Sequence, residues 1–161
     1  MMNYRKIELD GDYTDKKLES LLIQVAKWHN LTPKLWRPDH KASATDIEET
    51  IQRILDTKKE DLFLAIAEDH NEKVQGFIWA YKQEEPKDTV MILSLYVTEN
   101  YRGHGVATNL KTLLEKWCRS EGIKAIQTTV HYNNSNMLAL NQKLGYAPGM
   151  VYMTKPLIQN D

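Results

Sequence analysis

The residues whose types and spacing could do chemistry are concentrated in the segment 93–108, Leu-Ser-Leu-Tyr-Val-Thr-Glu-Asn-Tyr-Arg-Gly-His-Gly-Val-Ala-Thr. Its pattern predicts a β-strand, a short polar turn, a glycine loop and the first turn of a helix. The first N–H groups of a helix lack partners inside the helix, and the helix dipole adds partial positive charge there. Such donors bind anions and suit phosphate. The segment therefore predicts a site for a phosphorylated ligand.

The glycine loop from Arg102 to Thr108 differs from two common phosphate-binding patterns. It is not the dinucleotide fingerprint G-x-G-x-x-G, because Thr108 occupies the position of the third glycine. It is not a P-loop, because no Gly-Lys-Ser/Thr follows. Gly103 and Gly105 would let the backbone approach a phosphate without a Cβ in the way. On these two glycines alone, a tight turn before a helix is the alternative interpretation.

The rest of the chain must supply the elements that position this loop. Apolar periodicity predicts strands at 6–9, 62–67, 74–81, 90–97, 124–130 and 151–155, and helices at 14–29, 45–55, 106–121 and 134–144. A capping box at Thr45–Glu48 would open the second helix. The expected order is β-α-α-β-β-β-α-β-α-β.

This order predicts an α/β (α+β) fold with one mixed central sheet. The short connection between 62–67 and 74–81 indicates an antiparallel hairpin. The strand–helix–strand unit between 90 and 130 indicates a parallel pair joined by a right-handed crossover. We therefore expect a mostly antiparallel sheet of about six to seven strands with helices on both faces.

Length and composition restrict the class of protein. The chain has 161 residues, of which 42% are hydrophobic and 27% charged, which predicts a single globular domain over 1–161. A net charge of −1 gives no reason to expect nucleic-acid binding, and no apolar run approaches the ~20 residues of a membrane span.

Cysteine and histidine usage adds three expectations. A single cysteine, Cys118, excludes an internal disulfide, and the N-terminal residues lack the apolar core of a signal peptide, so we expect a cytoplasmic protein. Cys118 has no histidine at a recognisable spacing, which favours an inert thiol. The five histidines show no metal-ligand spacing, so no metal is expected.

Two motifs carry a resemblance to a known family. The run Arg102–Ala107, Arg-Gly-His-Gly-Val-Ala, matches the signature Arg/Gln-x-x-Gly-x-Gly/Ala after a strand and before an amphipathic helix. A second run, from Asn134 to Tyr146, reads Asn-x-x-Met-Leu-x-Leu-Asn-x-Lys-Leu-Gly-Tyr. In this order and spacing, both runs resemble the GNAT superfamily of acyl-CoA-dependent N-acyltransferases.

The resemblance implies acetyl-CoA as the cosubstrate. Backbone amides of the glycine loop would hold the pyrophosphate, and the strand before it would separate from the next parallel strand to admit pantetheine. Asn134 would hydrogen-bond the pantetheine arm, although a helix N-cap is the alternative role. The implied cofactor-binding residues are Leu95, Tyr96, Val97, Arg102, Gly103, His104, Gly105, Val106, Ala107, Thr108, Asn134 and Asn141.

Asn141 departs from the family pattern. Many members carry a tyrosine here that is proposed to protonate the departing thiolate, and asparagine has no proton to give at neutral pH. A buried amide needs a partner, which could be the cofactor arm, a water or a backbone group. Tyr96, Tyr132 and Tyr146 are the alternative acids, and no spacing selects among them.

The implied reaction is direct attack of a primary amine on the acetyl thioester in a ternary complex. The amine must be neutral to attack, so a base or a suitable water is needed. The strand 90–97 contains no carboxylate. Glu68, Glu99 and His131 are candidate bases, and the catalytic residues stay unassigned.

The acceptor would lie near the first two helices and their connection. Trp28, His29, Trp36 and Arg37 are the candidate acceptor-binding residues, with a core role for Trp28 and a solvated Arg37 as the alternative. The acceptor could be a small-molecule or a protein amine. The stretch after Tyr146 is short for the family's final hairpin, which leaves room for a second subunit and suggests a homodimer.

The sequence therefore predicts an acetyl-CoA-dependent N-acetyltransferase. A coenzyme A-binding module without transferase activity is the alternative, given the missing tyrosine and strand carboxylate. A nucleotide-binding regulator is a third interpretation of the same phosphate loop.

Overall fold

The computed structural model describes residues 1–9, 15–35 and 39–158. The chain divides into two compact units, Met1–Thr129 and Val130–Asp161. The first contains β1 (Asn3–Lys6), α1 (Lys16–Leu31), η1 (Thr32–Leu35), α2 (Ala44–Asp56), β2 (Leu62–Glu68), β3 (Val74–Lys82), β4 (Thr89–Val97), η2 (Glu99–Tyr101), α3 (Val106–Ser120) and β5 (Ala125–Thr128). The second contains α4 (Ser135–Lys143).

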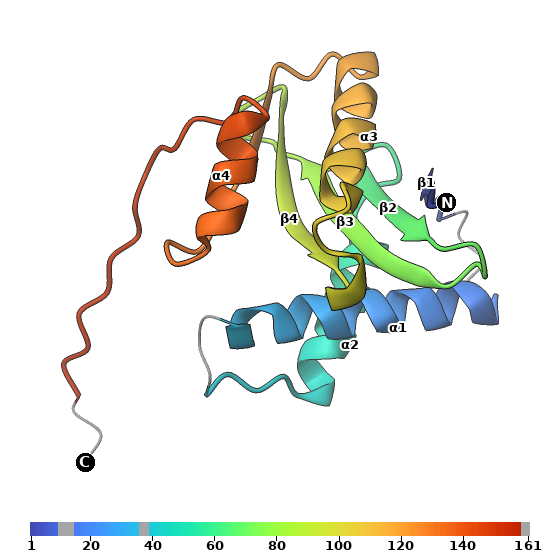
Figure 1. Cartoon of the computed structure of the whole chain (residues 1–161), viewed down its shortest axis with the longest axis horizontal. Helices are drawn as coiled ribbons and strands as arrows, with labels where there is room; N and C mark the ends of the chain where they lie inside the picture. Colours follow the sequence, from blue (N-terminus) through green and yellow to red (C-terminus); the bar gives the residue numbers. More distant parts are fainter. Residues whose placement is uncertain (10–14, 36–38, 159–161) are drawn as a thin grey trace. The chain divides into compact units, whose positions relative to one another are not determined.

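One five-stranded sheet in the order β1-β2-β3-β4-β5 organises the first unit (Figure 1). The pairs β1–β2, β2–β3 and β3–β4 are antiparallel, and β4–β5 is parallel. The expected mixed and mostly antiparallel sheet is confirmed. The first strand lies at Asn3–Lys6 rather than 6–9, because its ladder with β2 runs from Asn3 opposite Glu68 to Lys6 opposite Ala65.

The expectation of six to seven strands is wrong for the described part of the chain, which forms five. The run 151–155 alternates like a strand but has no regular structure in the second unit. Alternation alone does not make a strand, since a strand is stable only when a partner pairs with its backbone groups. The large apolar side chains of this stretch are exposed instead, namely Met150, Val151, Tyr152, Met153, Leu157 and Ile158.

Both faces of the sheet are covered by helices, as expected. Side chains alternate along a strand, so β2 and β3 present one apolar set to each face. The set containing Leu64, Ile66, Phe77 and Trp79 packs with α1 and α2 in one core cluster. The opposite set faces α3, which contacts β1 to β4 and crosses the sheet in Figure 1. The buried apolar residues of α3 are Val106, Leu110, Leu114 and Cys118.

The N-cap of α2 lies two residues before the predicted one. Ser43, not Thr45, is the N-cap, and its hydroxyl accepts from the Asp46 backbone N–H at 3.1 Å. The Asp46 carboxylate accepts from the Ser43 N–H at 2.8 Å, which completes the capping box. Ser43 and Asp46 thus form the capping box that was predicted for Thr45 and Glu48. Ser43 has the extended backbone that an N-cap requires.

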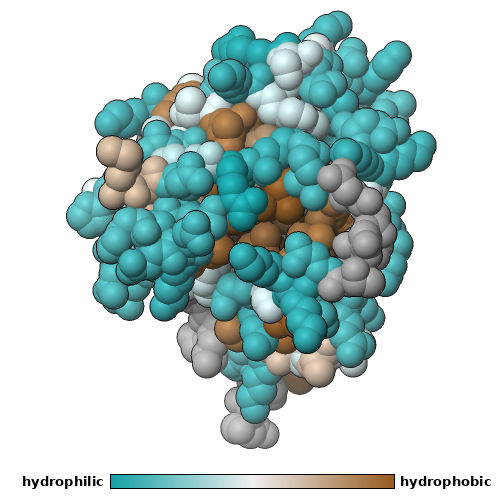
Figure 2. Space-filling view, turned by 90° about the vertical axis from the view of Figure 1, so that its right-hand side faces the viewer, coloured by the Kyte–Doolittle hydropathy of each residue, from teal (hydrophilic) through white to brown (hydrophobic). Residues whose placement is uncertain are grey.

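The side of the molecule that carries β1 shows apolar atoms in a hollow of a mostly hydrophilic face (Figure 2). A cavity of about 160 Å³ lies at this edge, lined by residues that include Ile7, Leu9, Leu55 and Leu62. These side chains belong to, or pack against, the core cluster between the sheet and the helices α1 and α2. None of the described helices combines the length and apolar character that crossing a bilayer requires.

We expect Leu110→Ala to lower the free energy of unfolding by about 2–5 kcal/mol, because it empties a fully buried position between α3 and the sheet. Lys116→Ala on the exposed side of the same helix should change it by less than about 0.5 kcal/mol. Urea titration of both variants, followed by circular dichroism, measures the difference. Equal stability of the two variants would contradict the assignment of the buried face.

Candidate functional site

The strands β4 and β5 are paired along only half of β4. Their parallel ladder runs from Thr89 opposite Ala125 to Ile92 opposite Thr128. The remaining residues of β4, 93–97, stay paired with β3 on one edge and have no strand partner on the other within the described residues. This edge, residues 93–97, is called the open edge of β4 below.

A β-bulge lies where the open edge begins. Trp79 pairs with Ser94 and Ala80 pairs with Ile92, so Leu93 is an extra residue opposite β3. A bulge bends its strand and increases the local twist. The bend therefore falls directly after Ile92, the last residue of β4 that pairs with β5, where β5 itself ends at Thr128. The separation of the two strands implied by the family resemblance stays a prediction.

The pleat of β4 determines which backbone groups lie along the open edge. The Thr98 N–H donates to the Gln75 carbonyl at 2.8 Å, and these two residues are directly opposite in register. Hydrogen-bonded pairs alternate along an antiparallel ladder, so Tyr96 is also bonded to β3. The N–H groups of Leu95 and Val97 consequently point away from β3, toward the open edge.

The turn after β4 is held by the side chain of Arg102. Its Nε donates to the Val97 carbonyl at 2.8 Å, and its guanidinium lies 5.5 Å from the centre of the Tyr96 ring. The η2 turn adds backbone bonds from the N–H of Tyr101 to Thr98 and from the N–H of Arg102 to Glu99. Arg102 thus joins the end of the strand to the start of the glycine loop.

The glycine loop turns through two glycines in the left-handed region. Gly103 and Gly105 have φ of +79° and +83°, a region that side chains rarely adopt. Gly105 is the N-cap of α3 and supplies no side-chain cap. In the described structure the N–H groups of residues 103–108 have no protein acceptor.

These free donors make the loop suitable for a phosphate. They are followed by a helix of 15 residues with no acidic side chain in its first turn. The dipole of such a helix corresponds to about half a positive charge at its N-terminus. Donors of this kind suit an anion such as phosphate, and the open edge adds the unpaired N–H groups of Leu95 and Val97 to the same end of β4.

Two of the predicted acceptor residues are described, and both lie in the aromatic packing of α1. Trp28 stacks on Tyr96 at a ring distance of 4.9 Å and on Phe77 at 6.1 Å. The His29 ring meets Trp79 edge-on at 5.2 Å. Burial, and then the charge of Arg53, lower the pKa of His29, so its ring is neutral at pH 7. Trp36 and Arg37 lie outside the described residues.

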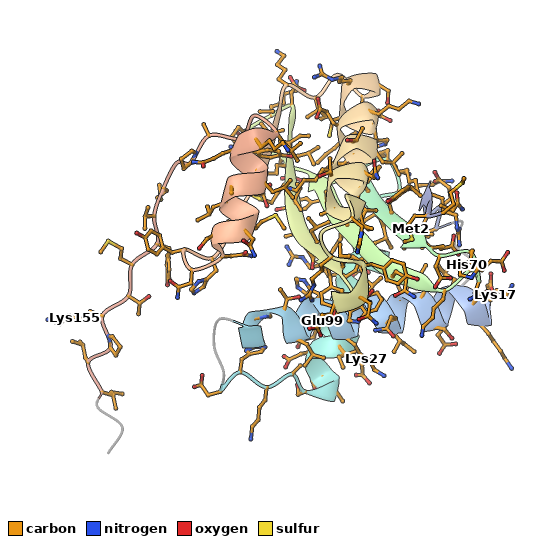
Figure 3. All side chains as sticks on the ribbon, in the orientation of Figure 1. Met2, Lys17, Lys27, His70, Glu99 and Lys155 are labelled. Atoms are coloured by element: carbon orange, nitrogen blue, oxygen red, sulfur yellow. The ribbon has the colours of Figure 1, made fainter. Side chains whose placement is uncertain are left out.

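The candidate bases of the first unit have different surroundings. Glu68 ends β2 and is paired with Arg5 at 2.5 Å, and β3 separates it from β4. The structure does not bring Glu68 to the open edge. Glu99 is exposed at the first position of η2, between the open edge and the glycine loop (Figure 3).

The remaining predicted residues belong to the second unit. His131 accepts from the Asn133 N–H at 3.1 Å, and the Tyr132 side chain is exposed. Asn134 is the N-cap of α4, and its side chain accepts from the Met137 N–H at 3.2 Å. The structure thus shows the helix-capping role that was the alternative to cofactor binding. Asn141 is buried, and its Oδ1 has no hydrogen-bond partner among the residues described. Their predicted roles toward the cosubstrate stay predictions.

Metal binding and thiol chemistry have no support in the described ranges. Within residues 1–9, 15–35 and 39–158, no group of three or more His, Cys, Asp or Glu residues is arranged to hold a metal ion. Cys118 is buried, and burial raises the pKa of its thiol to about 11. A thiol with this pKa is protonated at neutral pH and is a poor nucleophile.

A polar network at the end of β4 was not predicted from the sequence. Asp69, in the turn between β2 and β3, accepts from Gln75, and Gln75 accepts from the Thr98 hydroxyl. Thr98 is the residue between the open edge and η2. Its position directly after the strand was visible in the sequence, but no spacing links it to Gln75, because their pairing depends on the register of β3 and β4.

Comparison with known proteins places this geometry in a family. The model of the acetyltransferase (GNAT) family matches residues 24–146. An L-2,4-diaminobutyric acid acetyltransferase of Vibrio parahaemolyticus is 35% identical over 81 residues, which cover 50% of this chain and 44% of that protein. The uncharacterized N-acetyltransferase YdgE of Bacillus subtilis is 25% identical over 153 residues, covering 91% of this chain and 96% of that protein.

A solved structure extends the likeness to the fold. The structure of AAC(6')-Iy in complex with a bisubstrate analog, CoA-S-monomethyl-acetylneamine, superposes with a TM-score of 0.66 at 19% identity. It covers 97% of this chain and 99% of that chain. The resemblance expected from the two sequence motifs is therefore confirmed. With its interrupted β4–β5 ladder, its glycine loop and a family match that spans most of its length, the chain belongs to the acetyltransferase (GNAT) family.

Proposed function

We propose that this protein is an acetyl-CoA-dependent N-acetyltransferase that transfers an acetyl group to a primary amine by direct attack in a ternary complex. One observation carries the proposal: the open edge of β4 leads, through one short turn, to the unpaired amides of residues 103–108. A long ligand with a diphosphate at one end and amides along its arm matches both parts at once. The coenzyme A analog bound by AAC(6')-Iy is such a ligand.

Each part of the site has a separate task in this proposal. The amides of residues 103–108 and the N-terminus of α3 hold the diphosphate, and the Thr108 hydroxyl adds a donor. The N–H groups of Leu95 and Val97 pair with the arm, and one of them donates to the thioester carbonyl oxygen. Acetyl-CoA supplies the activated acetyl group. Holding both substrates together removes much of the entropic barrier.

The acceptor in this proposal is a small-molecule amine, with a protein amine as the wider alternative. Two relatives support this choice by name, since one is a diaminobutyric acid acetyltransferase and another was solved with an acetylneamine analog. His29, neutral and beside Trp79, is one described residue on the acceptor side able to accept a proton. Glu99, His131 and water stay the other candidate bases, and Tyr96 and Tyr132 the candidate acids.

Three wider expectations belong to the same proposal. We take residues 1–161 as one domain, which the family match across both units supports. A homodimer is supported by the exposed apolar side chains of 150–158 in the second unit. A cytoplasmic location stays a prediction from the sequence.

The activity is tested by incubating the protein with acetyl-CoA and a panel of diamines, amino acids, aminoglycosides and lysine peptides. Release of free coenzyme A thiol above the rate without acceptor is the expected result. Tight acetyl-CoA binding with no turnover on any acceptor would favour the binding module instead. Thermal protection by ATP but not by coenzyme A would indicate a nucleotide-binding regulator.

We expect Gly105→Arg to abolish acetyl-CoA binding while the fold survives. The arginine side chain would fill the space in front of the backbone N–H groups of the glycine loop. The left-handed backbone at this position costs a residue with a side chain only about 1–2 kcal/mol, so the fold should survive. Gly122→Arg is the matched control, since Gly122 has a φ of +71° in open space after α3. Isothermal titration calorimetry should show wild-type affinity for the control. Equal affinity of the two variants would refute the assignment of the loop.

We expect Asn141→Ala to retain turnover within about tenfold of the wild type, because loss of a true general acid costs roughly 10²–10⁴-fold. The Asn141 Oδ1 has no protein donor to lose in the described structure. Steady-state rates at saturating acetyl-CoA measure the effect. A loss as complete as that of Gly105→Arg would contradict this view of Asn141.

A further inference from the structure

Thr98 is held twice by a single residue of the neighbouring strand. Gln75, near the start of β3, is buried, with 8% of its surface exposed. Its backbone carbonyl accepts from the Thr98 N–H at 2.8 Å, and its Oε1 accepts from the Thr98 hydroxyl at 2.7 Å. Both the backbone and the side chain of Gln75 therefore fix the residue that follows β4.

Asp69 determines how Gln75 is oriented. One oxygen of its carboxylate accepts from the N–H groups of Asn71 and Lys73, and the other accepts from Gln75 Nε2 at 2.9 Å. These hydrogen bonds lower the pKa of Asp69, and the bond from Gln75 has the largest effect. The carboxylate is therefore ionised at pH 7. An ionised carboxylate only accepts. Gln75 must therefore direct its nitrogen to Asp69 and its oxygen to Thr98, whose hydroxyl must donate.

Thr98 also lies between the two parts of the site. Val97, the last residue of the open edge, precedes it, and the η2 turn follows with the Tyr101 N–H bonded to the Thr98 carbonyl at 3.0 Å. The Tyr101 hydroxyl reaches back to Asp69 at 3.4 Å. The network thus ties the turn between β2 and β3, whose tip is labelled by His70 in Figure 3, to the connection that carries the glycine loop.

We propose that the relay Asp69–Gln75–Thr98 is a positioning device that sets the spacing between the open edge of β4 and the glycine loop, and thereby the affinity for acetyl-CoA. The inference rests on the proposed function. A ligand that is bound at two places binds well only if the distance between the two binding places matches its length. A small displacement of one binding place therefore weakens the contacts at both. The three residues act through the backbone that they hold, not by touching the reacting atoms.

The first experiment removes one hydroxyl. Thr98→Val should raise the dissociation constant of acetyl-CoA roughly five- to tenfold, since it leaves the buried Gln75 oxygen without its donor. Thr98→Ser keeps the hydroxyl and should bind like the wild type. In all folded variants kcat at saturating acetyl-CoA should stay within about twofold, because the relay acts on binding.

A matched control separates positioning from general stability. Thr50 in α2 is also buried, and its hydroxyl accepts from the Asn30 amide at 2.8 Å and donates to the Asp46 carbonyl at 2.9 Å. Thr50→Val therefore removes a comparable hydroxyl away from the glycine loop. It should lower the melting temperature without changing the affinity for acetyl-CoA.

A second experiment reverses the polarity of the relay. Gln75→Glu places two carboxylates face to face and should weaken acetyl-CoA binding by a similar factor. Adding Asp69→Asn should restore it, because the amide nitrogen introduced by that substitution can donate to the new carboxylate while the amide oxygen still accepts from Asn71 and Lys73. Such restoration is the signature of direct pairing in a double-mutant cycle.

The outcomes are distinct. The relay would be overturned if folded Thr98→Val bound acetyl-CoA with wild-type affinity, or if Thr50→Val lost as much affinity as Thr98→Val. It would also be overturned if Asp69→Asn did not restore the affinity lost in Gln75→Glu. If Thr98→Val does not fold, the polarity reversal decides alone. A wild-type protein that binds no acetyl-CoA in calorimetry would overturn the proposed function itself, whereas a wild type that binds with all variants unchanged would overturn only the relay.

Discussion

The structure depends on how the backbone hydrogen bonds of β4 are distributed. Buried backbone groups must be paired, and a central strand normally pairs along both edges. β4 does so only as far as Ile92, and from the bulge at Leu93 onward one edge is left open. The antiparallel ladder with β3 continues to Val97 and keeps the strand in place. The open edge therefore arises because β5 ends opposite Ile92 and no other described strand pairs with residues 93–97.

The two helical layers make this arrangement stable. α1 and α2 pack on one face of the sheet and α3 on the other, so the open edge belongs to a sheet with two buried faces. The close approach of β3 and β4 at this end depends on Gly76, where a Cβ would lie 2.9 Å from the Tyr96 carbonyl oxygen. The aromatic side chain of Tyr96 contacts both Trp28 of α1 and Arg102, and these contacts fix the same segment. This packing fixes the end of β4 that precedes the glycine loop.

Much of this arrangement was predictable from the sequence, and the exceptions have physical reasons. The glycine loop and the order of elements through α4 were predictable, because positive-φ glycines and long amphipathic helices leave local signals. The strand expected at 151–155 was wrong, because apolar alternation does not reveal whether a partner strand exists. The bulge at Leu93 and the Gln75–Thr98 pair were not predictable, since both depend on the register between two strands. Trp36 and Arg37 lie outside the described residues.

The open edge has one further consequence, for the behaviour of the protein in solution. Unpaired N–H and C=O groups along a strand form a template on which strands of other molecules can add, the first step of sheet-mediated aggregation. Arg102 already covers the Val97 carbonyl, whereas the groups of Leu95 have no such cover from a strand in the described structure. A ligand lying along β4 would shield them. Under the proposed function, the edge that binds acetyl-CoA is thus also an edge on which other strands could add, and bound acetyl-CoA would protect the protein against self-association.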